Sequence, residues 1–314
     1  MPAIRFSGGL SFVSQHRMVT VLTAGHVNWD VTLRVERFPE PDGEVPIRAQ
    51  HQSGGGSAAN VAAALATLEV DTELIGSVGD DDNGLLARRE LEAAGVSLAG
   101  LRVIDNADTA VKYILVDDDG EVAVLGNDGV NEAIGPADLD PDRIAVADHV
   151  HLTSQRPDTA SRLATIASQA GATVSIDPGR RIADRDYDDA LACADVIFLN
   201  DNEAEAVLER THAIDVRDRL LAIKFGGDGA EVHTPSGSVS HPGFDIDAVD
   251  TTGAGDAFAA GFIRTYLETD GTDIERTLEF ANACGALAAS VEGARSAPVP
   301  AQVAAFLDER RENW

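Results

Sequence analysis

Short apolar runs alternate with amphipathic, alanine-rich stretches along most of the chain. The apolar runs have the length and β-branched composition of strands at residues 19–24, 71–78, 149–153, 173–177, 196–199 and 221–225. Residues 57–69 and 83–94 have helical spacing, and further helical stretches lie between most of the strands. Strands that alternate with helices usually pair in parallel. The pattern therefore predicts an α/β fold with a doubly wound, mainly parallel sheet and ligand sites at the carboxyl ends of its strands.

Two segments depart from this alternation. Residues 31–51 and 109–125 have the period of strands but no helix between their runs, and residues 117–120 have the composition of a hairpin turn. We expect these segments to form a small β layer over the main sheet. Such a layer could act as a lid that excludes water from a reaction. It could also be a β extension or a dimer edge, because exposed strand edges pair between subunits.

The charge balance is strongly acidic. The 314 residues include 53 acidic and 24 basic side chains, which gives a formal net charge of -29, and the only lysines are Lys112 and Lys224. The excess is spread along the chain, and molar salt would screen its self-repulsion. This favours a halophilic source, with an ordinary acidic cytosolic protein as the alternative. The sequence has no basic patch that could neutralise phosphates, which argues against nucleic-acid binding.

The chain has the pattern of one domain over residues 18–314, with no internal boundary. We expect residues 1–17 to be a disordered extension, the alternative being an extra ordered strand; they lack the order of a signal peptide. No apolar run is long enough to predict a membrane span. The two cysteines, Cys193 and Cys284, predict neither a disulfide framework nor a metal site. These features favour a reducing compartment, and we expect a cytoplasmic protein.

Residues 250–258, Asp-Thr-Thr-Gly-Ala-Gly-Asp-Ala-Phe, carry the strongest chemical signal. A glycine turn that opens a helix directs unpaired backbone N–H groups and the positive end of the helix dipole at one point. That point suits a developing negative charge. Asp256 lies at its edge and could take a proton from a hydroxyl group while the N–H groups hold a phosphoryl group. The segment therefore predicts phosphorylation of an alcohol.

Two polar clusters in the N-terminal half could bind the alcohol. Residues 54–60, Gly-Gly-Gly-Ser-Ala-Ala-Asn, allow close approach of a ligand to the backbone, and Asn60 lies one turn into the helix that follows. Asn28 and Asp30 come just after the first strand, where they could grip neighbouring hydroxyl groups or simply form an Asx turn.

Two clusters in the C-terminal half suit a nucleotide and its metal ion. The run Asn202-Glu203-Ala204-Glu205 follows a strand, and a carboxylate there could hold hydrated Mg²⁺ or cap the next helix. Residues 224–229, Lys-Phe-Gly-Gly-Asp-Gly, carry a strand into a glycine turn that would permit close approach of a nucleotide.

Together these segments resemble the signatures of the ribokinase-like (PfkB) carbohydrate kinases. Residues 250–258 resemble the family's C-terminal signature, residues 55–60 its N-terminal Gly-Gly signature, and residues 202–205 its Asn-x-x-Glu element, in the family's order. The resemblance covers roughly residues 18–307. It implies a three-layer α/β/α sandwich with a small β-sheet lid formed by about residues 31–51 and 109–125. It also implies a homodimer through the lid, and the use of ATP and Mg²⁺.

The resemblance also implies a role for each matching position. The base would be Asp256, and the anion hole would be formed by Gly253, Ala254 and Gly255. The acceptor would be bound by Asn28, Asp30, Gly55, Gly56, Ser57, Asn60, Gln155 and Arg180. The nucleotide would be bound by Asn202, Lys224, Gly226, Gly229 and Asn282. Mg²⁺ would be organised through water by Glu205 with Asn202. A monovalent cation, K⁺ in a halophile, would be held by Asp250, Thr252, Ala288, Val291, Gly293 and Ala297.

Departures from the ribokinase pattern bear on the acceptor. Ribokinases proper carry a lysine in place of Ser57 and a glutamate in place of Gln155. Arg180 and Arg181 follow a central strand and could hold the phosphate of a sugar phosphate, or pair with surface carboxylates. We therefore expect an ATP-dependent kinase that acts on the 5-hydroxyl group of ribose or ribose 1-phosphate. Alternatives are a nucleoside kinase, a keto-sugar kinase for fructose or 2-keto-3-deoxygluconate, and a nucleotide-binding regulator without catalysis, which the intact Asp256 argues against.

Overall fold

One large sheet organises the molecule. The computed structural model describes residues 20–210 and 219–311, so the extension predicted at residues 1–17 lies outside the described residues. Within them the sheet has the strand order β13-β12-β11-β10-β9-β8-β1-β4-β5. Its strands are β1 (Thr20–Ala24), β4 (Asp71–Gly79), β5 (Leu101–Ile104), β8 (His149–Thr153), β9 (Thr173–Asp177), β10 (Val196–Asn200), β11 (Leu220–Lys224), β12 (Ala230–Thr234) and β13 (Gly237–His241).

The neighbouring strands β11, β10, β9, β8, β1, β4 and β5 all run parallel, as the alternation of strands and helices predicts. Only β12 and β13 run antiparallel, as a ribbon at one edge. All six predicted strands are present within the described residues, and the doubly wound, mainly parallel sheet is confirmed. The sequence did not single out β5, β12 or β13. Because parallel strands end at the same edge, β1, β8, β9, β10 and β11 bring their carboxyl ends together.

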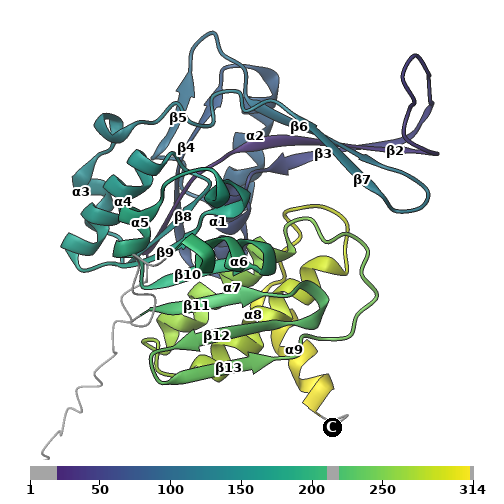
Figure 1. Cartoon of the computed structure of the whole chain (residues 1–314). Coiled ribbons are helices and arrows are strands. Elements are labelled where there is room, and N and C mark those ends of the chain that lie inside the picture. Colours follow the sequence, from purple (N-terminus) through teal and green to yellow (C-terminus); the bar gives the residue numbers. More distant parts are fainter. Residues whose placement is uncertain (1–19, 211–218, 312–314) are drawn as a thin grey trace, which may run out of the picture.

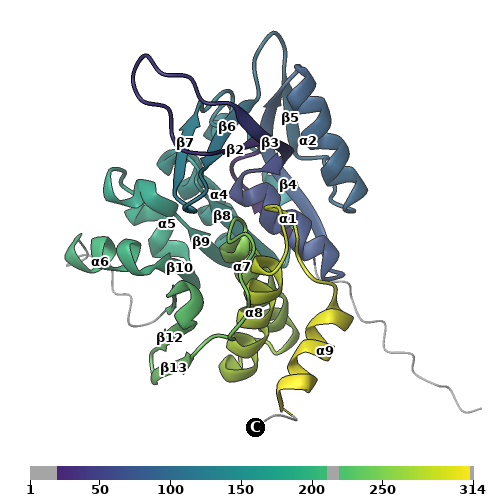
Figure 2. The same ribbon diagram turned by 90° about the vertical axis from the view of Figure 1, so that its right-hand side faces the viewer.

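Helices cover both faces of this sheet, giving three layers (Figures 1 and 2). One face is covered by α3 (Pro141–Ile144), α4 (Pro157–Ala170), α5 (Asp188–Cys193) and α6 (Asp201–Arg210). The other face is covered by α1 (Ser57–Thr67), α7 (Ala254–Glu268), α8 (Ile274–Ala289) and α9 (Pro300–Arg311). Helix α2 (Asp82–Ala93) packs beside α1, and short 3₁₀ helices are η1 (Pro136–Asp138), η2 (Gly179–Ala183) and η4 (Gly226–Asp228).

The core between the sheet and α7 is aromatic at its centre. Phe198 of β10 packs edge-to-face on Phe258 and Phe262 of α7, with ring centroids 6.5 and 5.2 Å apart. Small residues let α8 approach α7 closely: a Cβ at Gly261 would lie 2.7 Å from the Cys284 sulfur. This packing holds the first turn of α7, which carries residues 253–256, in a fixed position above the sheet.

The two alternating segments form a second, four-stranded sheet, ordered β3-β2-β6-β7. Its strands are β2 (Asn28–Val35), β3 (Ile47–Gly55), β6 (Ala110–Val116) and β7 (Val122–Gly126). It projects from the body of the molecule on the side of β4 and β5 (Figure 1). Only three residues separate β1 from β2, and β3 runs into α1 through Gly56. The second sheet is therefore anchored at the carboxyl edge of the first.

Two buried histidines on β8 form a hydrogen-bonded cluster with β9. His149 bonds to the hydroxyl groups of Thr173 and Ser175, and His151 bonds to that of Ser175, each at 2.7 Å. Burial lowers the pKa of both rings to about 3, from the ordinary 6.5. The folded chain therefore holds both rings neutral in the range in which the unfolded chain takes up protons.

We predict that the protein loses stability as the pH falls from 6.5 towards 3. The unfolded state binds these protons near pH 6.5 and the folded state only near pH 3, so each ring lowers the free energy of unfolding by roughly 3 kcal/mol at about pH 4.5. Thermal melts of the wild type should show this fall in Tm. The slope of Tm against pH should flatten in the His149→Gln/His151→Gln double variant and stay unchanged in His233→Gln, whose side chain is half exposed. Equal slopes in all three proteins would contradict the prediction.

Candidate active site

A hydrogen bond joins the first turns of α1 and α7. Asn60 Nδ2 donates to Asp256 Oδ2 at 2.8 Å, although the two residues are 196 positions apart in the chain. The bond brings together the two glycine-rich segments that the sequence singles out, residues 54–60 and 250–258. The predicted base thus lies beside the predicted acceptor-binding residues.

The turn before α7 has the geometry of an anion-binding nest. Gly253 is the N-cap of α7, with a φ of 78°, and a Cβ there would collide with the carbonyl oxygen of Ala294. The N–H group of Ala254 donates to Thr251 O at 3.2 Å. The next N–H groups, those of Gly255 and Asp256, lie in the first turn of α7, where no carbonyl group one turn back can receive them. These two groups are the better placed to meet an anion.

The pKa of Asp256 suits a general base that works near neutral pH. Burial raises the pKa of its carboxyl group to about 6, while the hydrogen bond from Asn60 and the charge of Lys224 oppose the rise. A base works best when its pKa lies near the working pH. Above pH 6 this carboxylate is therefore ionised and still basic enough to accept a proton from an alcohol.

Unsatisfied polar atoms line the floor beside Asp256. Asn28 and Asp30 are buried, yet Asn28 Nδ2 and Asp30 Oδ1 have no hydrogen-bond partner in the described part of the chain. Asn28 Oδ1 is fixed by Asn131 Nδ2 at 2.6 Å. Buried polar atoms without partners are costly, so such atoms point to a polar ligand. We call Asn28, Asp30, Gly55 and Asn60 the acceptor floor.

Close contacts explain why the N-terminal signature has glycine at these positions. A Cβ at Gly55 would collide with the Asp30 carboxylate, and one at Gly56, where φ is 92°, would collide with the His26 carbonyl group. Ser57 opens α1 directly after them. Gln155 is buried just beyond the end of β8, and its carbonyl group accepts a hydrogen bond from Tyr187 at 2.6 Å. Both side chains are therefore near the strand ends that carry the acceptor floor.

Sequence reasoning missed Arg295, which stands behind the acceptor floor. Its guanidinium donates to Asn60 Oδ1 at 3.3 Å, to the Gly55 carbonyl group at 3.2 Å and to Glu90 at 3.1 Å. A Cβ at Gly54 would overlap it. By holding Asn60 Oδ1, Arg295 turns the amide so that Nδ2 faces Asp256. A single arginine on a loop gives no sequence signal of such a contact.

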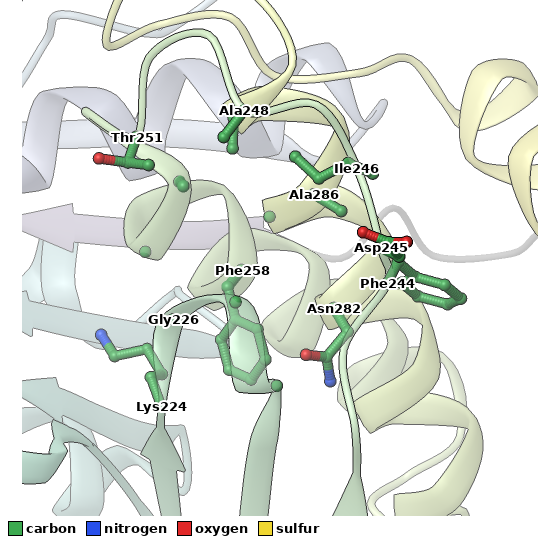
Figure 3. Close-up of a pocket in the computed structure, with 16 residues that line it drawn as sticks. Lys224, Gly226, Phe244, Asp245, Ile246, Ala248, Thr251, Phe258, Asn282 and Ala286 are labelled. Carbon is green, nitrogen blue, oxygen red and sulfur yellow. The ribbon is translucent and has the colours of Figure 1, made fainter.

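A cavity of about 360 Å³ lies on the other side of the nest (Figure 3). Four of the five predicted nucleotide-binding residues line it, namely Lys224, Gly226, Gly229 and Asn282, together with Ala254 and Gly255 of the nest. Phe244, Ile246 and Phe258 give it apolar walls. Its size and mixed lining suit a nucleotide whose phosphates point towards the nest.

Lys224 forms a buried ion pair beside the nest. Its ammonium nitrogen lies 2.7 Å from Asp177 Oδ2 at the end of β9. Burial alone would lower the pKa of Lys224, but the charges of Asp177, Asp256 and Glu203 raise it overall. Lys224 therefore stays charged at the point where phosphates would lie.

The structure brings Glu203, not Glu205, to this ion pair. Glu203 is buried; burial raises its pKa, and the charges of Asp177 and Lys224 act on it. It also forms a capping box with Asn200, with bonds of 2.9 and 2.8 Å. Glu205 instead lines a shallow hollow with Asp201 and His233, and Asn202 is exposed. Neither predicted Mg²⁺ residue lines the cavity; Glu203 is the glutamate of this helix whose charge acts on Lys224, a cavity-lining residue.

The predicted monovalent-cation residues gather at the end of α8 and on two adjoining loops. Asp250 accepts hydrogen bonds from the N–H groups of Thr252 at 2.9 Å and Gly293 at 3.1 Å. Burial opposes ionisation of Asp250, but these donors lower its pKa overall. Ala288 is buried at the end of α8, Val291 is largely exposed, and Ala297 packs against the core of α7 and α8. The loops can present carbonyl oxygens, the donors that K⁺ prefers.

The two arginines after β9 face different surroundings. Arg180 is exposed, and its charge acts on Glu203. Arg181 is held by Asp128 at 2.8 Å and by Glu132 at 2.7 Å. The pairing with carboxylates that the sequence left open is therefore observed for Arg181.

Within residues 20–210 and 219–311, no group of three or more His, Cys, Asp or Glu side chains has the geometry of a metal site. A Mg²⁺ ion bound through water and nucleotide phosphates needs only one or two carboxylates, and Glu203 and Asp177 fit that requirement. In the same residues, no helix has the length and apolar character needed to cross a membrane.

Comparison with known proteins identifies the family. Residues 18–302 match the pfkB family carbohydrate kinases. The chain belongs to this family. An ATP-dependent ribose-1-phosphate kinase of Halopiger xanaduensis is 70% identical over 296 residues, covering 93% of this kinase and 99% of the relative. A nucleoside kinase of Methanothermobacter thermautotrophicus is 27% identical over 284 residues, covering 88% and 91%.

Solved structures show the same fold. The ribokinase of Arabidopsis thaliana, complexed with ribose and ATP, superposes with a TM-score of 0.83 at 24% identity, over 93% of this kinase and 99% of that chain. The nucleoside kinase of Methanocaldococcus jannaschii gives 0.82 at 24% identity, over 93% and 99%. The expected ribokinase-like α/β/α fold and the membership of a phosphotransferase family are confirmed.

We predict that Asn60→Ala raises the kinetic pKa of the base. The wild-type kcat/KM should fall about tenfold per pH unit below pH 6, because a protonated Asp256 cannot accept a proton. The hydrogen bond from Asn60 lowers the pKa of Asp256, so its loss should move this acid limb to higher pH. The pH profile of kcat/KM measures the shift directly. An acid limb that stays in place while activity falls would mean that Asn60 acts only in binding.

Proposed function

We propose that this kinase transfers the γ-phosphoryl group of ATP to the 5-hydroxyl group of ribose 1-phosphate. The observation that carries the proposal is the 70% identity, over nearly the whole chain, with a ribose-1-phosphate kinase. The acceptor floor supports it, because its unsatisfied amide and carboxylate atoms suit the hydroxyl groups of a pentose. A nucleoside kinase is the second candidate, supported by the relative of that function.

In the proposed reaction Asp256 accepts the proton of the 5-hydroxyl group. The oxygen then attacks the γ-phosphorus, and the bond from that phosphorus to the β,γ-bridging oxygen breaks, which releases ADP. The N–H groups of Gly255 and Asp256 meet the negative charge on the transferring group. Residues of the acceptor floor hold the sugar so that the attacking oxygen lies in line with the leaving group.

The cavity in Figure 3 would hold the nucleotide, with Lys224 and Gly226 near its phosphates and Asn282 near its base. Asn282 Nδ2 donates one hydrogen bond to the Leu278 carbonyl group at 2.8 Å, which fixes the amide and leaves its oxygen and its second N–H for a ligand. Mg²⁺ would neutralise phosphate charge, held through water by Glu203. K⁺ would bind the carbonyl groups of residues 250–252 and 288–297 and stabilise the conformation of the adjoining nest.

We also propose a homodimer, joined through the second sheet, that works in the cytoplasm at high salt. Large apolar side chains are exposed on this sheet: Ile47, Tyr113, Val122, Val124 and Leu125. Pairing of two such sheets would cover them and would close a lid over the acceptor floor. The 53 acidic against 24 basic residues support a high-salt setting.

Asp256→Asn should lower kcat by at least about 100-fold with ATP and ribose 1-phosphate, because the asparagine cannot accept the proton. ADP release in molar KCl measures this, and thermal melting checks that the variant is folded. Full activity in Asp256→Asn would show that another group is the base.

A panel of acceptors tests the substrate. The wild type should use ribose 1-phosphate with the highest kcat/KM among ribose 1-phosphate, ribose, nucleosides and keto-sugars. A clear preference for a nucleoside would support the second candidate instead. No turnover with any acceptor would favour a regulator that binds nucleotide without catalysis.

The metal role is tested by comparing two glutamates on one helix. Glu203→Gln keeps the capping geometry but removes the charge, so the Mg²⁺ concentration for half-maximal activity should rise about tenfold or more. Glu205→Gln should change it by less than about twofold, because Glu205 faces a different hollow. A Mg²⁺ titration of both variants decides the matter. The opposite order would restore Glu205 as the metal-organising residue.

A further inference from the structure

Lys112 lies on β6, in the second sheet, directly beside Asp30. The two residues are register partners in the parallel pair of β2 and β6, and such partners direct their side chains to the same face. Asp30 faces Gly55 in the acceptor floor. On the other side the register partner of Lys112 is Gly126, where a Cβ would lie 3.4 Å from Lys112 Cγ. The lysine stem therefore leaves the sheet on the same face as Asp30, in the space beside Gly126 where no side chain stands.

Within the described residues, Lys112 and the exposed Arg180 are the cations around the site that have no ion pair with a carboxylate. Lys224 is paired with Asp177, Arg181 with Asp128 and Glu132, and Arg295 with Glu90. In the described part of the chain, no carboxylate oxygen lies within 4 Å of the Lys112 ammonium group. The chain has more than twice as many acidic as basic residues. Lys112 is half-buried as a residue, and an ammonium group that such a chain leaves without a carboxylate is suited to an anion that arrives with the substrate.

A second donor lies nearby without a partner. His26, at the end of β1, is buried, and its Nε2 atom makes no hydrogen bond within the described residues; the nearest carboxylate, Glu132, is 3.7 Å away. Burial, helped by the charges of Arg181 and Lys112, lowers the pKa of His26 to about 4, so the ring is neutral and can donate one N–H group. The charge of Lys112 also opposes the effect of burial at Asp30. Lys112 is thus electrostatically close to both His26 and Asp30.

We infer that Lys112 binds the phosphate group that the acceptor already carries, and so makes the kinase prefer a sugar phosphate to a free sugar. This inference rests on the proposed function. With the 5-hydroxyl group at Asp256, the 1-phosphate lies at the far end of the ring, over Asp30 and towards His26. Arg180, the cation that the sequence suggests for this role, is exposed, and its charge acts on Glu203 of α6.

Three variants test the inference in molar KCl. Lys112→Met keeps the stem and removes the charge, Lys112→Arg keeps the charge, and Arg48→Met removes a charge from the same sheet. Arg48 is exposed and is paired with Glu36 and Asp118, away from the acceptor floor. We expect Lys112→Met to lower kcat/KM for ribose 1-phosphate about 10- to 100-fold, mainly through KM, and to change it for ribose less than about threefold. Lys112→Arg and Arg48→Met should stay within about threefold of the wild type for both acceptors.

Calorimetric binding of ribose 1-phosphate without ATP supplies a readout that does not require turnover. Lys112→Met should weaken this binding at least about tenfold and leave ADP binding unchanged. Equal losses with both acceptors, or unchanged ribose 1-phosphate binding, would overturn the inference. Failure of the proposed function is a separate outcome, because it is seen in the wild type as an absence of turnover with ribose 1-phosphate.

Discussion

The site depends on the hydrogen bond from Asn60 to Asp256. It links the N-terminal half of the chain, which supplies the acceptor floor, to the C-terminal half, which supplies the nest and the nucleotide cavity. A carboxylate in this position faces opposing demands. Burial must raise its pKa enough to make it a base, while the Asn60 amide and Lys224 must keep it ionised near neutral pH. Arg295 fixes the Asn60 amide through its oxygen, so that one arginine supports both the acceptor floor and the base.

The few positive charges of the chain are also concentrated at the site. The chain is acidic along its length, yet both of its lysines lie at the site: Lys224 lines the nucleotide cavity, and Lys112 is the register partner of Asp30. A strongly hydrated ammonium group is a good ligand for phosphate. In an acidic protein, phosphorylated substrates are repelled at long range, and salt screens that repulsion. Local cations are then needed where the phosphates bind, and we infer that Lys224 serves the nucleotide and Lys112 the acceptor.

Much of the fold and part of the site follow from local sequence. Strand and helix periodicity predicts the parallel sheet, and glycine-rich turns before helices predict the nest and the acceptor floor, because these features depend on neighbouring residues alone. The antiparallel ribbon of β12 and β13 is different. Its strands are short and partly exposed, so their sequence has little apolar periodicity. The four-stranded sheet keeps its alternation and was visible in the sequence.

Contacts between segments far apart in the chain could not be predicted from the sequence. Arg295 and Asn131 act through residues far away in the chain, and nothing beside them marks that role. Residues 200–205 show a second limit of prediction from sequence, because a motif can match at two overlapping positions. Asn200 with Glu203 and Asn202 with Glu205 both have the Asn-x-x-Glu spacing, and sequence alone cannot distinguish them. The structure does so because β10 ends at Asn200, which caps α6 and turns Glu203 inwards. Half a helical turn later, Glu205 faces outwards.

The most direct measurement of the central claim is a crystal structure of the wild-type kinase with ribose 1-phosphate and a non-hydrolysable ATP analogue at high KCl. The account predicts that the 5-hydroxyl oxygen lies within about 3 Å of the Asp256 carboxylate. The γ-phosphate should lie at the N–H groups of Gly255 and Asp256, and the 1-phosphate at Lys112. A sugar bound with its 5-hydroxyl group away from Asp256, or a nucleotide bound outside the cavity beside α7 and α8, would contradict it.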